Sequence, residues 1–163
     1  MIINQSVKIA LLVCVSLLSG CASQLKLDEP VKITPVPQLL EQGQRQLQSR
    51  KYVTAIFLYE QALEQEPNNI PALLGVADAS LAINKLADAK KYYEKILTNA
   101  PDNLHAAEGK ALVYFKRHDT ERAQQQLTEV LNQDNTRWRS WNALGIIAEL
   151  EVSFETAQLH FKK

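Results

Sequence analysis

The sequence predicts an all-α protein in which about four helical hairpins stack side by side into a solenoid. The first observation is an alanine that recurs every 34 residues, at Ala55, Ala89, Ala123 and Ala157. The second is a bulky residue four positions after each of these alanines, namely Tyr59, Tyr93, Leu127 and Phe161. The third is a composition of 46% hydrophobic and 22% charged residues with only 5 glycines, which is typical of a helical domain.

Two helices fit into each 34-residue unit. Pro67 and Pro101 end the second helix of their units, and the polar pairs behind them, Asn68-Asn69 and Asp102-Asn103, offer N-caps to the next helix. A long coiled coil is the alternative, but the recurring prolines would interrupt its heptads. The predicted repeat domain, 37–163, consists of units at about 36–69, 70–103, 104–137 and the incomplete 138–163. Helices are expected near 37–49, 53–65, 70–83, 86–99, 104–117, 120–132, 137–150 and 154–163.

Small residues recur within the first helix of each unit, at Gly43, Ala77, Ala111 and Gly145. They allow the two helices of a hairpin to approach closely, while the bulky series fills the space beside them. The fourth unit reads Trp141-x-x-Leu144-Gly145, followed by Ala157-x-x-x-Phe161. This pattern resembles that of tetratricopeptide repeats over about residues 36 to 163. The resemblance implies a stack of hairpins that binds other proteins.

The N-terminal segment, 1–20, is predicted to be a lipoprotein signal peptide. Its apolar run, Ile9 to Leu18, is too short to span a bilayer of about 30 Å as a helix. Leu18-Ser19-Gly20-Cys21 resembles the lipobox of bacterial lipoproteins, which implies that Cys21 carries lipid and that Cys14 is lost with the signal. An ordinary secretory signal cut near Ala22 is the alternative.

Residues 21–36 are expected to form a flexible linker between the lipid and the repeats. Pro30 and Pro35 break any helix there, and a chain of this length reaches about 45 Å from a membrane. In lipoproteins of the enterobacterial kind, Ala22 after the lipidated cysteine implies export to the outer membrane, facing the periplasm.

The partner is expected to bind in a groove formed by the first helix of each unit, because residues three and four apart share a helix face. Part of this face could instead pack between adjacent helices. Chaperone-binding relatives hold a C-terminal carboxylate here with Lys and Asn, but this chain has Gln44 and Asp78, so that ligand is not expected. The predicted groove residues, beside Leu40 and Gln44, are Leu47, Leu74, Asp78, Leu81, Glu108, Leu112, Phe115, Asn142, Ile146 and Glu149.

No catalytic residue, metal site, cofactor or small-molecule substrate is predicted. His105, His118 and His160 lie far apart, without metal-ligand spacing, and no phosphate-binding loop occurs in the sequence. The 18 basic and 18 acidic residues balance, so nucleic acid is not an expected partner. Trp141 is expected in the core, whereas Trp138 is expected to be more open.

The run from Thr136 to Gly145, TRWRSWNALG, narrows the resemblance. Together with the lipobox and the tether, it is similar to the TadD family of tetratricopeptide-repeat lipoproteins from the tight-adherence (Tad/Flp) pilus machinery. This implies a non-enzymatic factor, tethered to the outer membrane, that binds the secretin or pilus assembly components. The alternatives are a secretin pilotin, a general envelope-assembly lipoprotein or a regulator of cell-wall enzymes.

The last helix, expected from about Phe154, is predicted to turn Ala157 and Phe161 inward against Trp141 and Gly145. The rest of its apolar surface would face a missing next unit. We therefore expect the chain to self-associate or to fray beyond about residue 150.

Overall fold

The computed structural model describes the backbone of residues 34–161 and the side chains of residues 34–153. The predicted signal peptide, Cys21 and nearly all of the linker lie outside the described residues. The described part is all-α and contains no strand. Its helices are α2 (Val36–Gln48), α3 (Tyr52–Gln65), α4 (Ile70–Ala82), α5 (Leu86–Asn99), α6 (Leu104–Lys116), α7 (Thr120–Gln133) and α8 (Trp138–Phe161).

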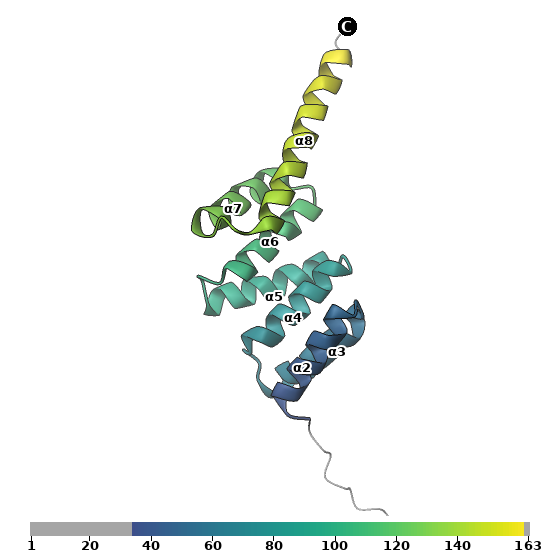
Figure 1. Ribbon diagram of the computed structural model, residues 1–163, viewed down its shortest axis with the longest axis vertical. Helices are drawn as coiled ribbons and strands as arrows, with labels where there is room; N and C mark the ends of the chain where they lie inside the picture. The colour runs from purple at the N-terminus through teal and green to yellow at the C-terminus, as the bar shows by residue number, and fades with distance from the viewer. Residues whose placement is uncertain (1–33, 162–163) are drawn as a thin grey trace, which may run out of the picture. The chain divides into compact units, whose positions relative to one another are not determined.

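The helices pack in sequence order, as the prediction of stacked hairpins requires (Figure 1). The pairs α2–α3, α4–α5 and α6–α7 form the first three hairpins, and each hairpin packs on the next. The first helices also contact one another along the stack, α2 with α4, α4 with α6 and α6 with α8. Among the described helices, the backbone of α3 does not approach that of α5, nor that of α5 the backbone of α7, as closely as the first helices approach one another, so the second helices splay apart. Nowhere between residues 34 and 161 is a helix both long and apolar enough to cross a membrane.

Tyrosine rings fill the crossing points of the helices. The ring of Tyr59 in α3 lies against Gly43 of α2 and Gly75 of α4, and the ring of Tyr93 lies against Gly109 of α6. A Cβ atom at any of these glycines would come closer than 3.0 Å to the ring, so the close approach depends on glycine. One unit later, Leu127 and Ala143 hold the equivalent positions, and both are buried.

The loops between hairpins confirm the predicted caps. Asn69 accepts a hydrogen bond from the backbone N–H of Ala72 at 3.0 Å, and Asn103 accepts one from Ala106 at 2.9 Å. The second residue of each polar pair is therefore the N-cap. Each asparagine satisfies one of the helix's unpaired N–H groups, which typically stabilises the helix by about 1 kcal/mol.

The turns within the hairpins depend on one residue with a left-handed backbone. Arg50, Asn84 and His118 have φ of 57°, 62° and 61° and lie 34 residues apart. The residue after each donates its N–H to a carbonyl five positions back, as Lys85 does to Ser80 at 2.8 Å. This Schellman geometry closes the end of the first helix.

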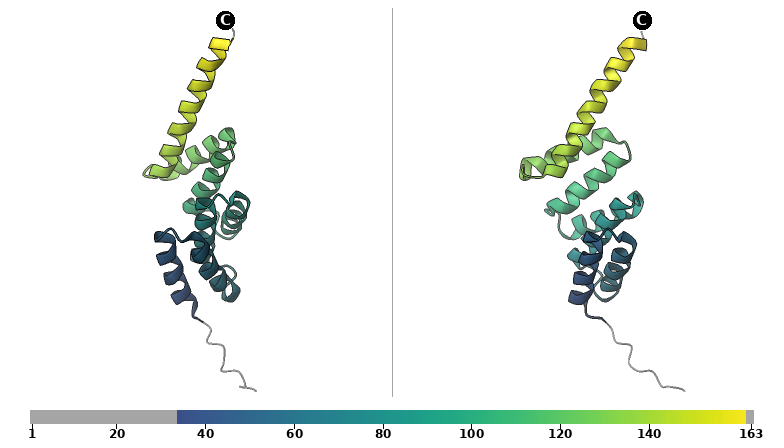
Figure 2. Two further views of the ribbon diagram at one scale, coloured as in Figure 1. Left: turned by 90° about the vertical axis from the view of Figure 1, so that its right-hand side faces the viewer. Right: turned by 45° about the vertical axis from the view of Figure 1, so that its right-hand side comes forward.

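The predicted turn in the fourth unit is absent, because α8 is one continuous helix of 24 residues (Figures 1 and 2). The separate helices expected at 137–150 and 154–163 are therefore wrong. Val152 occupies the position of Arg50, Asn84 and His118. A left-handed conformation costs an L-residue roughly 1–2 kcal/mol, and it is least tolerated by β-branched side chains. The helix avoids this cost by continuing.

Trp141 and Gly145 consequently lack the cover that was expected from residues 154–163. The side chain of Trp141 is 56% exposed, so its expected place in the core is wrong. A Cβ atom at Gly145 would meet nothing within 4 Å. Ala143 and Ile147, on another side of α8, are buried in a cluster with Ala111 and Leu127.

Alanine substitutions at two of the glycines should therefore differ in their effect on stability. Gly109→Ala is expected to lower the free energy of unfolding by about 1–3 kcal/mol, because the new methyl group collides with the fully buried Tyr93 ring. Gly145→Ala is expected to leave stability unchanged or raise it by up to about 1 kcal/mol, because alanine favours the helix and has room. Urea unfolding of both variants measures the difference, and a loss at Gly145 equal to that at Gly109 would contradict this account.

Candidate protein-interaction surface

The predicted groove residues lie on the helices that contact one another along the stack. We call the outward-facing side chains of this set the first-helix surface. Gln44, Asn142, Ile146 and Glu149 are exposed on it. Leu40, Leu47, Leu74, Asp78, Leu112 and Phe115 are half-buried, and the five apolar ones also pack against the core.

Two predicted groove residues lie inside the protein instead. Leu81 is 4% exposed and packs in the same cluster as Leu73 and Tyr93. Glu108 is 3% exposed and faces the next unit. Both illustrate the alternative that part of this helix face packs between neighbours. Periodicity assigned these residues to the face correctly but could not tell how deeply each one lies.

Asp78 connects three helices. Its Oδ1 accepts a hydrogen bond from the Tyr93 hydroxyl of α5 at 2.6 Å, and the Nε2 of His105 in α6 lies 2.8 Å from its Oδ2. Burial, and then the charge of Asp78, raise the pKa of Tyr93 well above its usual value, so the phenol stays a neutral donor. One unit earlier, Tyr59 donates to Gln44 at 3.2 Å in the equivalent place. His105 was not among the predicted groove residues, because its spacing from the others gave no signal of this pairing.

Glu108 is the centre of a buried polar cluster at the junction of α6 and α8. Its carboxylate accepts hydrogen bonds from Arg137 at 2.9 Å and from the Ser140 hydroxyl at 2.7 Å. A second arginine, Arg139, lies 4.0 Å away. The Nε of Arg137 has no hydrogen-bond partner but lies 3.3 Å from Asp134, close enough for an ion pair. The cluster therefore balances the buried negative charge with positive charge.

This cluster has no counterpart at the same positions of the preceding unit. In the preceding unit the positions of Glu108, Arg137 and Ser140 are held by Leu74, Asn103 and Ala106. The three changes occur together in space, because all three side chains meet. Position within the repeat could have revealed them, since each departs from the residue type of the units before it.

A cavity of about 250 Å³ opens beside this cluster. Its wall includes Trp138, which is 72% exposed, as its expected openness requires. Hydrogen bonds from the hydroxyl and then the backbone N–H of Thr136 hold the pKa of Asp134, also in the wall, below its usual value. The site thus combines an aromatic face with two arginines and an ionised carboxylate. The remaining wall residues are Glu108, Arg137 and Arg139.

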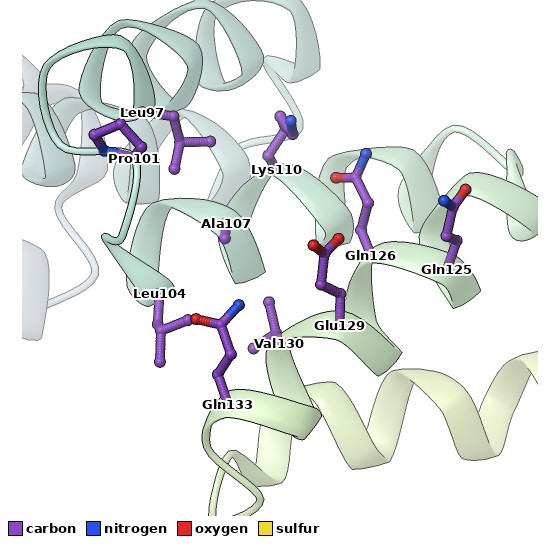
Figure 3. Close-up of a pocket in the computed structure, with 10 residues that line it drawn as sticks. All are labelled: Leu97, Pro101, Leu104, Ala107, Lys110, Gln125, Gln126, Glu129, Val130 and Gln133. Atoms are coloured by element: carbon purple, nitrogen blue, oxygen red, sulfur yellow. The ribbon is translucent and has the colours of Figure 1, made fainter.

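A second cavity, of about 330 Å³, lies where the second helices splay apart (Figure 3). Leu97 of α5 and Val130 of α7 flank it, and α6 contributes Leu104 and Ala107 (Figure 3). A smaller cavity, of about 130 Å³, lies one unit earlier, and Tyr92 of α5 lines it. Gln126 lines the larger cavity at the repeat position that Tyr92 holds one unit earlier. The prediction, which considered only first helices, missed this site.

No group of three or more His, Cys, Asp or Glu side chains that could hold a metal ion occurs among the residues that the structure describes.

Comparison with known proteins identifies the family. A family model described as "Tetratricopeptide repeat" matches residues 46–110 and 84–145, which together span more than half of the chain. The protein belongs to the tetratricopeptide repeat family. Tetratricopeptide-repeat domains mediate protein–protein interactions. No curated protein sequence matches the chain.

Solved structures share the fold at low sequence identity. The first tetratricopeptide domain of Spaghetti (RPAP3), bound to the HSP90 peptide SRMEEVD, has a TM-score of 0.66 and 20% identity over 77% of this chain and 99% of that one. The Sgt2 domain from Aspergillus fumigatus has a TM-score of 0.64 and 22% identity, over 79% and 87%. The Arabidopsis OM64 domain has a TM-score of 0.65 and 14% identity, over 70% and 94%.

The buried cluster gives a prediction on stability. Arg137→Ala should lower the free energy of unfolding by about 3 kcal/mol, because it leaves the Glu108 carboxylate buried with only Ser140 bonded to it. The triple variant Glu108→Leu, Arg137→Asn and Ser140→Ala restores the residues of the preceding unit and should stay within about 1 kcal/mol of the parent. Urea unfolding measures both. A triple variant as unstable as Arg137→Ala would contradict this view of the junction.

Proposed function

We propose that this protein is a non-enzymatic scaffold, held at a bacterial membrane by lipid on Cys21, that assists assembly of a Tad/Flp-type pilus or its secretin. The observation that supports a role in protein binding is the first-helix surface, on which half-buried leucines of α2, α4 and α6 lie beside polar side chains, and which continues onto α8 with exposed residues. Such a surface gives up little hydration when it binds an apolar segment, and its polar groups fix the orientation.

Charge on this surface argues against an acidic peptide as the ligand. The solved RPAP3 domain holds the HSP90 peptide SRMEEVD, whose glutamates, aspartate and terminal carboxylate are negative. The present chain places the carboxylate of Asp78 at the centre of the first-helix surface and that of Glu149 at its end. Like charges repel, so we expect a partner segment that is apolar or basic rather than acidic.

The pilus proposal rests on the sequence around the polar cluster and on the N-terminal segment. The Arg137-Trp138-Arg139 run and the Leu18-Ser19-Gly20-Cys21 lipobox are both features of the TadD resemblance. The cavity beside Trp138 gives that run a site at which a partner could insert a side chain. The second candidates, a secretin pilotin or a general envelope-assembly lipoprotein, share the same surface and the same anchor. A regulator of cell-wall enzymes is the least supported alternative.

The partner can be tested by crosslinking in cells that make the pilus. A photo-reactive amino acid at Asn142 or Ile146 is expected to form an adduct with the secretin or a pilus assembly component, because both positions are exposed on the first-helix surface. The matched control is Glu64, which is exposed on the second helix α3 and should give no such adduct. Mass spectrometry identifies the partner. Equal adducts at all three positions, or none with envelope-assembly proteins, would remove the proposal.

The anchor has its own test. Cys21→Ala is expected to abolish incorporation of a labelled fatty acid, because its thiol is the proposed lipid acceptor, and to leave the precursor uncleaved or unanchored. Cys14→Ala is the matched control and should keep full labelling, since Cys14 is proposed to leave with the signal peptide. Label that persists in the Cys21→Ala protein would show that the anchor lies elsewhere or does not exist.

A further inference from the structure

One side of α8 presents an apolar row that no other described helix covers, although the Trp141 indole donates a hydrogen bond to the Asn135 carbonyl at 2.9 Å. We call Trp138, Trp141, Gly145, Ala148 and Val152 the open face of α8. Their spacing of three and four residues places them on one side of the helix, away from the buried Ala143 and Ile147. Trp138, Trp141 and Val152 are 72%, 56% and 62% exposed. Solvent-exposed rows of this kind mark interaction sites.

The open face is the fourth instance of an interface that the chain forms three times. Leu39, Leu73 and Ala107 hold the position of Trp141 in earlier units; the two leucines are buried, at 2% and 0%, and Ala107 is half-buried. Gly43, Ala77 and Ala111 hold the position of Gly145, and all three are buried too. In each case the second helix of the same hairpin provides the cover, as Tyr59 of α3 does for Gly43.

The segment that would cover the open face is present but is held away from it. Ala157 and Phe161 stand in register with Ala55 and Tyr59, the residues of α3 that face α2. However, they continue the same straight helix. Phe161 lies 16 positions after Gly145, so the rise of an α-helix separates the two residues by roughly 24 Å. Figure 2 shows no described helix beside the second half of α8 in either view.

We propose that a second copy of this chain covers the open face, and that the two copies exchange residues 153–161. The two α8 helices would pair antiparallel, each supplying its second half to the first half of the other. The contact between Gly43 and Tyr59, moved by three repeats of 34 residues, becomes a contact between Gly145 of one copy and Phe161 of its partner. An antiparallel pair with this register has its twofold axis at Ser153.

The exchange satisfies both copies with the same set of contacts, as a twofold interface requires. The exchange is explained by Val152, which we call the hinge. This residue disfavours the left-handed turn that Arg50, Asn84 and His118 provide in the closed hairpins. Without that turn, the second half of α8 cannot return to its own first half. The inference uses only the repeats and does not depend on the proposed pilus function.

The charges near the proposed twofold axis predict how the dimer responds to salt. Glu149 and Glu151 are exposed within four residues of Ser153, so the two copies bring like charges together. Salt should therefore strengthen the dimer by screening this repulsion, whereas a partner held by opposite charges would be released.

Crosslinking between two differently tagged copies of the full chain tests the pairing. Gly145→Cys in one copy and Phe161→Cys in the other should be joined by a short bismaleimide, and Ser153→Cys should be joined to itself. Two Gly145→Cys copies should not be joined, because the proposed register keeps these positions far apart. The parent chain, with Cys14 and Cys21, is the control for background. A single chain with both substitutions that crosslinks internally as a monomer would show that the hairpin closes and would overturn the proposal, as would a monomer with no crosslink.

The hinge gives a second test with a matched control. Val152→Asn introduces the residue found at Asn84, which tolerates the left-handed turn, and should raise the dimer dissociation constant about tenfold or more by allowing the hairpin to close. Val152→Ile keeps the β-branch and should leave the dimer intact. Sedimentation of the full chain in detergent measures both. A parent chain that is monomeric, or a Val152→Asn chain that dimerises as well as the parent, would overturn the proposal.

Discussion

The closeness with which a tyrosine ring approaches the neighbouring helix sets the spacing of the stack. Tyr59 lies against glycines of the helices before and after it, and Tyr93 repeats the contact with Gly109. Because these rings fill the space that a Cβ atom would occupy, Tyr59 fixes α3 against both α2 and α4, and Tyr93 fixes α5 against α6. The contacts between first helices and the splay of the second helices are consistent with tyrosine rings that pack close against the first helices.

The cluster around Glu108 differs from these apolar contacts because it buries charged groups. Burying them gives no net gain in folding stability that the packing explains. A buried ion pair gains from its partners about what it loses in hydration, so the uncharged residues found at these positions one unit earlier would stabilise the junction as well. What the cluster does provide is geometry: it holds Arg137 beside Glu108 and thereby fixes the start of α8, with Trp138 pointing into solvent. Tryptophan and arginine are the residue types most enriched at binding hot spots, and here an exposed tryptophan lies between two arginines.

Much of the fold was predictable because the same sequence signals recur in each unit of the repeat. The 34-residue alanine series, the prolines and the capping asparagines gave the first six helices to within one residue at either end. Gly75 and Gly109 were not predicted as contact residues. They lie two positions before Ala77 and Ala111, and each contacts the tyrosine of the preceding unit, so their role appears only when two units are packed together.

The turn at Val152 was predicted from the repeat, but the helix continues through it. The preference of valine against a left-handed backbone had a larger effect than the repeat pattern. The interaction surface was harder to predict, since periodicity gives the direction of a side chain and not its depth. Leu81 and Glu108 point the way that was expected, yet neighbouring helices cover them.

Asp78 makes the coupling between units uneven. In a linear array each unit unfolds with its neighbours only as far as the interfaces between them demand. Because one carboxylate bonds to Tyr93 within its own hairpin and to His105 in the next, the second and third units share a link that cannot be broken one hairpin at a time. Opening fluctuations should therefore begin at the ends of the array and stop at this boundary, so that the middle of the first-helix surface keeps its shape while its edges adjust to a bound segment.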